Sequence, residues 1–357
     1  MNTKKLILII LFALGALTLS ACGGQVSVAN WPGLAADTER AYISSGSHVY
    51  AVDLKTGDEV WRYPAEADGK LLFFANPVIT QDGQLLIGSE GTNHAFVSIN
   101  PVTGKDNWVG PFSGAKAPWV ASPLVLNDKI YAPNTDGFIY VLDLTGKPAG
   151  DPIEIGGALW SAPVTDGTIL YVSSLDHHIH LINPQENSSA EPVDLGGAAP
   201  SSPAVADDGV YVGSFSSRIE FISSSGKQEV IAEAPNWIWG TPVLDGETLY
   251  YADLNGNIFS YDLASGKQNW GDVQPDGPVV AKLLLVGDQI YVATEAGTLV
   301  ALDREAKIVW EKEVGGRIYT SPVASGDLVL VAPYQAEFAL AAYDPDGKQV
   351  WDYTPAK

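Results

Sequence analysis

The sequence predicts an all-β fold: an eight-bladed β-propeller built from four-stranded antiparallel blades. First, one motif recurs eight times at spacings of 39 to 46 residues, a period typical of stacked or radial copies of one unit. Second, apolar runs of four to six residues are divided by Asn-Gly, Asp-Gly and Ser-Gly turns, as in hairpin-linked strands. Third, the 357 residues are 46% hydrophobic and 17% charged, which is the composition of a folded chain.

Each copy opens at a marker position that proline usually occupies. In copy six the expected strands are 241–244, 248–252, 258–262 and 268–270. Four short strands at a period near forty are typical of a propeller blade. Neither end has a polar capping unit of the kind a linear stack would need, so we expect residues 30–357 to close into one propeller. The expected markers are Pro32, Pro77, Pro123, Pro163, Pro203, Pro242, Lys282 and Pro322.

Residues 1–21 are predicted to be a signal peptide. Lys4 and Lys5 precede an apolar run over 6–19 that is too short to span a bilayer comfortably. The tetrapeptide Leu19-Ser20-Ala21-Cys22 resembles the lipobox of bacterial lipoproteins, which implies cleavage before Cys22 and lipidation of its thiol. The alternative is an ordinary secretory signal with an incidental cysteine. Cys22 is the only cysteine, so no disulfide can form within the chain.

The residues after the expected cleavage site predict a location. Residues 22–29 would form a lipidated tether with an r.m.s. reach of roughly 15 Å. Gly23 follows the cysteine, so an aspartate-type inner-membrane retention signal is absent. We therefore expect an extracytoplasmic, lipid-anchored protein. It would lie on the outer membrane of a double-membraned cell, or otherwise on the outer face of the plasma membrane.

The net charge excludes some partners. The chain has 20 basic and 42 acidic side chains and a formal charge of −22. Removal of residues 1–21 takes away two lysines and no acids, which leaves −24. Such a field repels phosphate backbones and anionic headgroups. We expect no nucleic-acid partner, and membrane attachment only through the lipid.

A motif at the third and fourth strands points to a family. Residues 51–61 read Ala-Val-Asp-Leu-Lys-Thr-Gly-Asp-Glu-Val-Trp, which resembles the repeat of the PQQ-like (quinoprotein) propeller family. Copies at 100–108, 262–270, 303–310 and 344–351 are similar. The resemblance implies that the tryptophans dock between adjacent blades; these are Trp61, Trp108, Trp270, Trp310 and Trp351.

Copies three, four and five lack the tryptophan, so we expect these three blades to be held less tightly at their outer edges. The glycine of the Thr-Gly turn tolerates positive φ.

The sequence lacks the redox-active groups of quinoprotein dehydrogenases. The only cysteine is assigned to the lipid, so no cysteine pair can lie against a quinone, and no Cys-x-x-Cys-His haem motif occurs. A propeller fold alone confers no activity. We therefore predict no enzyme, no catalytic residues and no cofactor. The alternative is an enzyme or sensor that binds PQQ or another small ligand in the central channel.

One histidine cluster is a candidate metal site. Asp176, His178 and His180 follow a two-residue period, which would place them on one face of a strand beside His177. Two imidazoles and a carboxylate can bind zinc. These positions match ordinary turn and strand residues in other copies, however, so we predict no metal site.

Aromatic residues just before the markers are the candidate partner-binding set. Equivalent positions in a propeller fall on one ring, so these side chains would share a rim of the central channel. Aromatic rings suit recognition because they bury much area at little rotamer cost. The alternative is that they wedge between blades. The set comprises Phe74, Trp160, Trp239 and Tyr319, three residues before a marker, and Trp119, four before.

Signal, repeat number and length are similar to those of a lipoprotein member of the PQQ-like family that acts in the machinery inserting outer-membrane β-barrels. The resemblance implies a monomeric, non-catalytic scaffold that binds envelope proteins or peptides.

Overall fold

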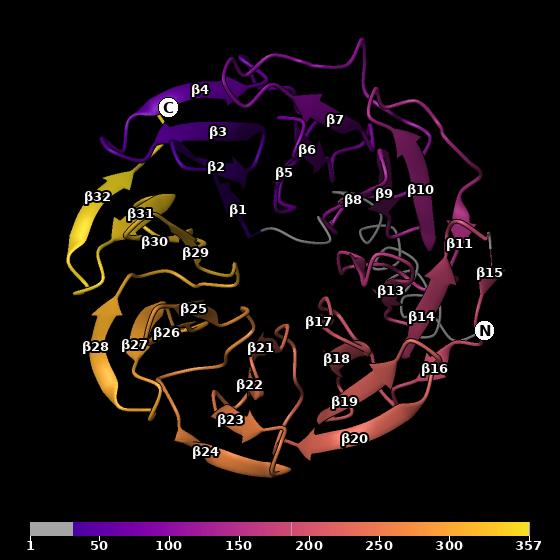
Figure 1. The fold of residues 1–357 in the computed structure, drawn as a ribbon. Helices are drawn as coiled ribbons and strands as arrows, with labels where there is room; N and C mark the ends of the chain where they lie inside the picture. The colour runs from indigo at the N-terminus through magenta and orange to yellow at the C-terminus, as the bar shows by residue number, and fades with distance from the viewer. Residues whose placement is uncertain (1–30, 187, 357) are drawn as a thin grey trace, which may run out of the picture.

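The computed structural model describes residues 31–186 and 188–356, and within them every regular element is a β-strand. The strands form eight sheets arranged around a central axis (Figure 1). The prediction of an all-β, eight-bladed propeller is confirmed. Each blade uses strands that are consecutive in sequence and antiparallel.

The first four blades comprise the following strands. Blade 1 contains β1 (Gly33–Ala36), β2 (Arg40–Ser45), β3 (His48–Asp53) and β4 (Glu59–Tyr63). Blade 2 contains β5 (Val78–Ile79), β6 (Leu85–Gly88) and β7 (Phe96–Ile99). Blade 3 contains β8 (Leu124–Leu126), β9 (Lys129–Pro133), β10 (Phe138–Asp143) and β11 (Ile153–Glu154). Blade 4 contains β12 (Val164–Thr165), β13 (Leu170–Ser173), β14 (His178–Asn183), β15 (Ser188–Ser189) and β16 (Val193–Asp194).

The last four blades are regular. Blade 5 contains β17 (Ala204–Ala206), β18 (Gly209–Gly213), β19 (Arg218–Ser223) and β20 (Gln228–Glu233). Blade 6 contains β21 (Val243–Asp245), β22 (Thr248–Ala252), β23 (Ile258–Asp262) and β24 (Lys267–Val273). Blade 7 contains β25 (Leu284–Val286), β26 (Gln289–Ala293), β27 (Thr298–Leu302) and β28 (Ile308–Glu313). Blade 8 contains β29 (Val323–Ser325), β30 (Leu328–Val331), β31 (Leu340–Tyr343) and β32 (Gln349–Tyr353).

Two blades depart from four regular strands at their outer edge. In blade 2 the fourth position is held only by bridges, Phe96 to Phe112 and Ile99 to Asp106. In blade 4 the outer position is divided between β15 and β16, which pair with opposite ends of β14.

The sheet register also corrects two marker positions. In each blade the residue after the marker pairs with an equivalent residue of the second strand, as Val243 does with Tyr250. The same pairing joins Leu284 to Tyr291 and Ala35 to Tyr42. The markers of copies seven and one are therefore Leu283 and Leu34, not Lys282 and Pro32.

The turn between the third and fourth strands owes its shape to an aspartate and a glycine. In blade 1 the Asp53 carboxylate accepts hydrogen bonds from the backbone N–H groups of Lys55 and Thr56, at 2.8 and 3.1 Å. These bonds lower the pKa of Asp53. Gly57 follows at φ 76° and donates its N–H to the Asp53 carbonyl at 2.9 Å. The Asp-x-x-Thr-Gly pattern is thus a turn-forming signal.

The hydrophobic core lies between blades. Eight buried clusters are present, and each combines residues of two neighbouring blades. One cluster joins the last blade to the first, with Leu340 and Trp351 packed among Ile43 and Val52. Ser325 also donates its hydroxyl to the Asp37 carbonyl at 2.6 Å across this junction. The ring is therefore closed by packing between blades 8 and 1, which Figure 1 shows as neighbours.

Candidate functional site

Five aromatic side chains occupy equivalent positions in their blades. They occupy the position three residues before the marker in their copies, and we call them the aromatic collar: Trp31, Phe74, Trp160, Trp239 and Tyr319. All five are half-buried. The ring centroids of Trp31 and Tyr319 lie 5.3 Å apart, and those of Trp160 and Trp239 lie 6.4 Å apart. Sequence-equivalent positions of different blades thus meet at the channel mouth.

A small cavity lies within the collar. It has a volume of about 260 Å³ and is lined by Trp31, Trp239, Leu254, Pro278, Val280, Glu295 and Tyr319. We call it the collar pocket. Its walls are mainly apolar rings and aliphatic side chains. Glu295 accepts hydrogen bonds from Tyr319 at 3.0 Å and from Arg317 at 2.9 Å, which holds Tyr319 in place. The pocket can enclose one large apolar side chain.

The aromatic surface continues outward over blades 5 and 6. Phe215 stacks on Trp237 with centroids 4.7 Å apart and an interplanar angle of 15°. Phe215 also lies 5.4 Å from the collar residue Trp239. Trp237 is 50% exposed. A single large solvent-exposed ring beside an apolar pocket is a typical recognition feature.

Three of these aromatic residues were not in the predicted set. The sequence prediction omits Trp31 because it places the marker of copy one at Pro32 and not at Leu34. Trp237 precedes Trp239 by two residues in Trp237-Ile238-Trp239, an alternation that places both on one face and was available in the sequence. Phe215 lies in the turn between β18 and β19. Nothing in the repeat pattern marks it.

The prediction that Trp119 belongs to the rim set is wrong, because its side chain is fully buried. Its ring lies 5.0 Å from Phe96, and its ring N–H donates to the His94 carbonyl at 2.8 Å. Trp119 stands four residues before its marker, not three. The same position in other copies is also fully buried, as at Phe73, Leu159, Ile238 and Ile318. Trp119 therefore wedges between blades, and a one-residue shift reverses which side a strand residue faces.

The five tryptophans of the Thr-Gly-type turns each contact the next blade. Each donates its ring N–H to a backbone carbonyl in that blade's turn, at 2.8 to 3.0 Å. The donor and acceptor pairs are Trp61 with Pro101, Trp108 with Leu144, Trp270 with Arg304, Trp310 with Pro345, and Trp351 with Leu54. In four of the five pairs the indole also packs over the turn glycine; these glycines are Gly104, Gly146, Gly347 and Gly57. The fifth ring, Trp270, meets a turn in which Ala306 adopts the positive φ.

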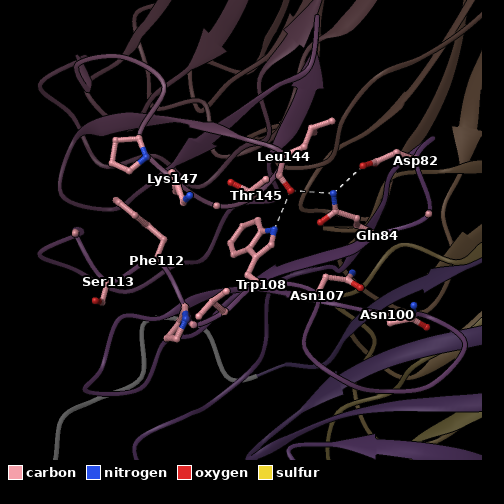
Figure 2. A pocket seen from close by; sticks show the side chains of 17 residues that line it. Asp82, Gln84, Asn100, Asn107, Trp108, Phe112, Ser113, Leu144, Thr145 and Lys147 are labelled. Atoms are coloured by element: carbon pink, nitrogen blue, oxygen red, sulfur yellow. Dashed lines mark hydrogen bonds between the residues drawn. The ribbon is translucent and has the colours of Figure 1, made fainter.

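A second cavity lies at the periphery, where blade 2 lacks a regular outer strand. It has a volume of about 1100 Å³ (Figure 2). Trp108 points to the Leu144 carbonyl, which also accepts from Gln84 at 3.0 Å. Its wall consists of Asn100 and of the three loops over 82–84, 107–114 and 144–148, so it lies at the junction of blades 2 and 3.

Two side chains of the histidine cluster form hydrogen bonds within their own segment of the chain. His180 hydrogen bonds to the Asp176 carboxylate at 2.9 Å, and His178 to the Asp176 carbonyl at 2.8 Å. Burial acts to raise the pKa of the Asp176 carboxyl. Its hydrogen bonds, first among them the one from the backbone N–H of His178, act in the other direction, and the pKa of Asp176 is lowered overall. Within 31–186 and 188–356, no group of three or more His, Cys, Asp or Glu side chains is placed to hold a metal ion.

The signal peptide, Cys22 and the tether over 22–29 lie outside the described residues. Nowhere in the described part of the chain is there a helix both long and apolar enough to traverse a bilayer.

Known proteins were compared with this chain. The family model described as outer membrane protein assembly factor BamB, a PQQ-like repeat model, matches residues 45–272 and 274–356. The chain belongs to this family. A BamB from Nitrosomonas eutropha is 28% identical over 113 residues, which is 31% of this chain and 27% of that protein. A BamB from Kangiella koreensis is 34% identical over 88 residues, 24% of this chain and 21% of that protein. The matched segments thus span about a quarter of these relatives.

Solved structures show the same fold over most of the chain. The crystal structure of BamB from Moraxella catarrhalis superposes with a TM-score of 0.65 at 17% identity, covering 88% of this chain and 91% of that one. The computationally designed Ika8 protein gives a TM-score of 0.71 at 13% identity, covering 90% and 96%.

Proposed function

We propose that this protein is a non-catalytic scaffold of the BamB type, which binds envelope proteins during assembly of outer-membrane proteins. The main support for this proposal is the family match along most of the propeller. The accessible aromatic collar at the channel mouth supplies a surface for such binding. The relatives are named as outer membrane protein assembly factors. We further propose that Cys22 carries a lipid that anchors a monomeric propeller to the outer membrane.

The proposed occupant of the collar is an extended segment of an envelope protein that inserts one large apolar side chain into the collar pocket. The pocket is walled by Trp31, Trp239 and Tyr319. Trp237 and Phe215 would cover the neighbouring part of the segment. Rigid aromatic anchors of this kind carry most of the binding energy in protein interfaces.

Site-specific photocrosslinking in cells tests this proposal. A photoreactive residue replaces Trp237 on the collar face, and a matched control replaces Val350, which is similarly exposed on the outer strand β32. We expect the first to crosslink to an outer-membrane β-barrel protein or to an assembly-machinery component, and the second not to. Equal crosslinking at both positions, or recovery of neither class of protein, contradicts the proposal.

The anchor has its own test. Cys22→Ala should move the protein from the membrane fraction to the soluble extracytoplasmic fraction. Retention of the variant in the membrane fraction would contradict lipid anchoring through this residue.

The described residues are a poor fit to the alternative function, a quinoprotein-like enzyme that binds PQQ. PQQ in the related dehydrogenases works beside a calcium ion, and among residues 31–186 and 188–356 no group of three or more His, Cys, Asp or Glu side chains is placed to hold a metal ion. Addition of PQQ with calcium should therefore leave the thermal midpoint unchanged. A calcium-dependent rise would revive the enzyme hypothesis.

A further inference from the structure

The central channel contains one cation in an otherwise uncharged ring. We call the residues directly before the eight markers the channel ring: Gly33, Asn76, Ser122, Ala162, Ser202, Thr241, Lys282 and Ser321. A cavity of about 520 Å³ lies at this level and is lined by residues of every blade except the third, so it is the channel itself. Seven ring positions are small, hydroxyl or amide residues. Lys282 alone carries a charge.

Lys282 has no counter-ion. Among the described residues, no carboxylate lies within ion-pair distance of its ammonium, although the chain carries 42 acidic side chains. The side chain is exposed to the channel cavity, and the protein around it lowers the pKa of Lys282 by desolvation. An unpaired ammonium that faces a channel is available to form a charge-assisted hydrogen bond with an anion.

Two hydroxyl residues from the neighbouring blades line the same cavity as Lys282. Ser321, in the next blade, accepts the backbone N–H of Lys282 on its Oγ at 2.9 Å. The Ser321 hydroxyl hydrogen is therefore free to be donated elsewhere. Thr241, in the preceding blade, lines the same cavity. An ammonium and two hydroxyl donors in the wall of one cavity match one carboxylate, which accepts several hydrogen bonds and carries a single negative charge.

The collar pocket and the channel cavity are linked by one short segment of the chain. Val280 precedes Lys282 by two residues in the same chain segment and lines the collar pocket. Two residues of chain span at most about 7 Å. A molecule with an apolar group in the collar pocket and a carboxylate about one dipeptide length away would contact both.

We propose that Lys282, Thr241 and Ser321 form a binding site for a single carboxylate in the central channel. The carboxylate comes either from a small organic acid or from the C-terminus of a peptide chain. The site requires only the channel geometry, so it stands independently of the scaffold role.

Titration calorimetry of the mature protein tests the site with sodium benzoate, and with benzamide as the neutral isostere. We expect saturable benzoate binding, and none with benzamide. Lys282→Met should weaken benzoate binding at least about tenfold, as expected for loss of one charge-assisted hydrogen bond. Thr241→Val should weaken it about threefold to tenfold. Lys267→Met, which removes an exposed lysine from β24, serves as the charge-matched control and should change nothing.

Two peptides distinguish the sources. Acetyl-Gly-Phe with a free carboxylate should bind more tightly than benzoate if the natural ligand is a chain end, and its C-terminal amide should not bind. If benzoate binds and the peptide does not, the ligand is a small organic acid. No saturable benzoate binding, equal binding of benzamide, or unchanged binding to Lys282→Met would overturn the proposal. Circular dichroism of each variant checks that the propeller is intact.

Discussion

Trp351 closes the ring, and its removal should cost most of what one buried tryptophan contributes. It is 8% exposed, packs among residues of blades 1 and 8, and donates its ring N–H to the Leu54 carbonyl at 2.8 Å. Truncation of a buried tryptophan to alanine costs about 3–5 kcal/mol. Since domains are stable by only about 5–15 kcal/mol, Trp351→Ala should remove a large part of the free energy of unfolding.

Urea denaturation followed by circular dichroism measures this loss. Trp351→Phe keeps most of the apolar area but loses the N–H donor, so it should cost about 1–2 kcal/mol. Val350→Ala, at the exposed neighbouring position, should stay within about 0.5 kcal/mol.

Trp310 provides the comparison that tests closure. It makes the same contact at an internal junction, with its N–H on the Pro345 carbonyl at 2.8 Å. In a closed ring, Trp310→Ala and Trp351→Ala should both be strongly destabilising. A Trp351→Ala variant within about 1 kcal/mol of the parent would refute closure by this contact.

Two further predictions concern single side chains. At Gly57 (φ 76°) an added Cβ would lie 2.9 Å from the Trp351 ring, whereas at Gly46 (φ 59°) it would meet nothing within 4 Å. Gly46→Ala should therefore cost only backbone strain, about 1 kcal/mol, and Gly57→Ala clearly more; equal losses in urea denaturation would argue against the close approach. Glu220 is buried, and its Oε2 has no hydrogen-bond partner. Burial raises the pKa of Glu220, so the folded state binds its proton more tightly and stability falls as pH rises above the unfolded value of about 4.3. Glu220→Gln should raise the thermal midpoint at about pH 7 and not at about pH 4; a constant difference would contradict this titration.

The repeat period was enough to predict the fold because every copy carries its own strand and turn signals. In copy six the predicted strands 248–252 and 258–262 coincide with β22 and β23. The outer edge was less predictable. In blade 2, Gly110, Pro111 and Gly114 interrupt the segment where a fourth strand was expected, and proline cannot donate to a ladder.

The candidate surface was predicted in part. Phe74, Trp160, Trp239 and Tyr319 lie in the collar, but Trp119 does not, because its offset from the marker is one residue greater. Contacts between copies, such as Trp160 with Trp239 or Phe215 with Trp237, depend on blade geometry. Spacing within a copy carries no such information. The repeat spacing predicts Lys282 as the marker itself, whereas the pairing of Leu284 with Tyr291 places it one residue earlier, at a position that lines the channel cavity.

The place of Trp31 has a consequence for orientation. The first described residue, Trp31, lies in the collar. Trp31 follows Cys22 by nine positions, a span of roughly 30 Å when fully extended. With a lipid on Cys22, the collar would be the side turned toward the bilayer, and the Asp-x-x-Thr-Gly turns would point away from it. A partner that uses the collar would then have to enter the narrow layer between propeller and lipid, where membrane-bound chains are concentrated and freely diffusing ones are not.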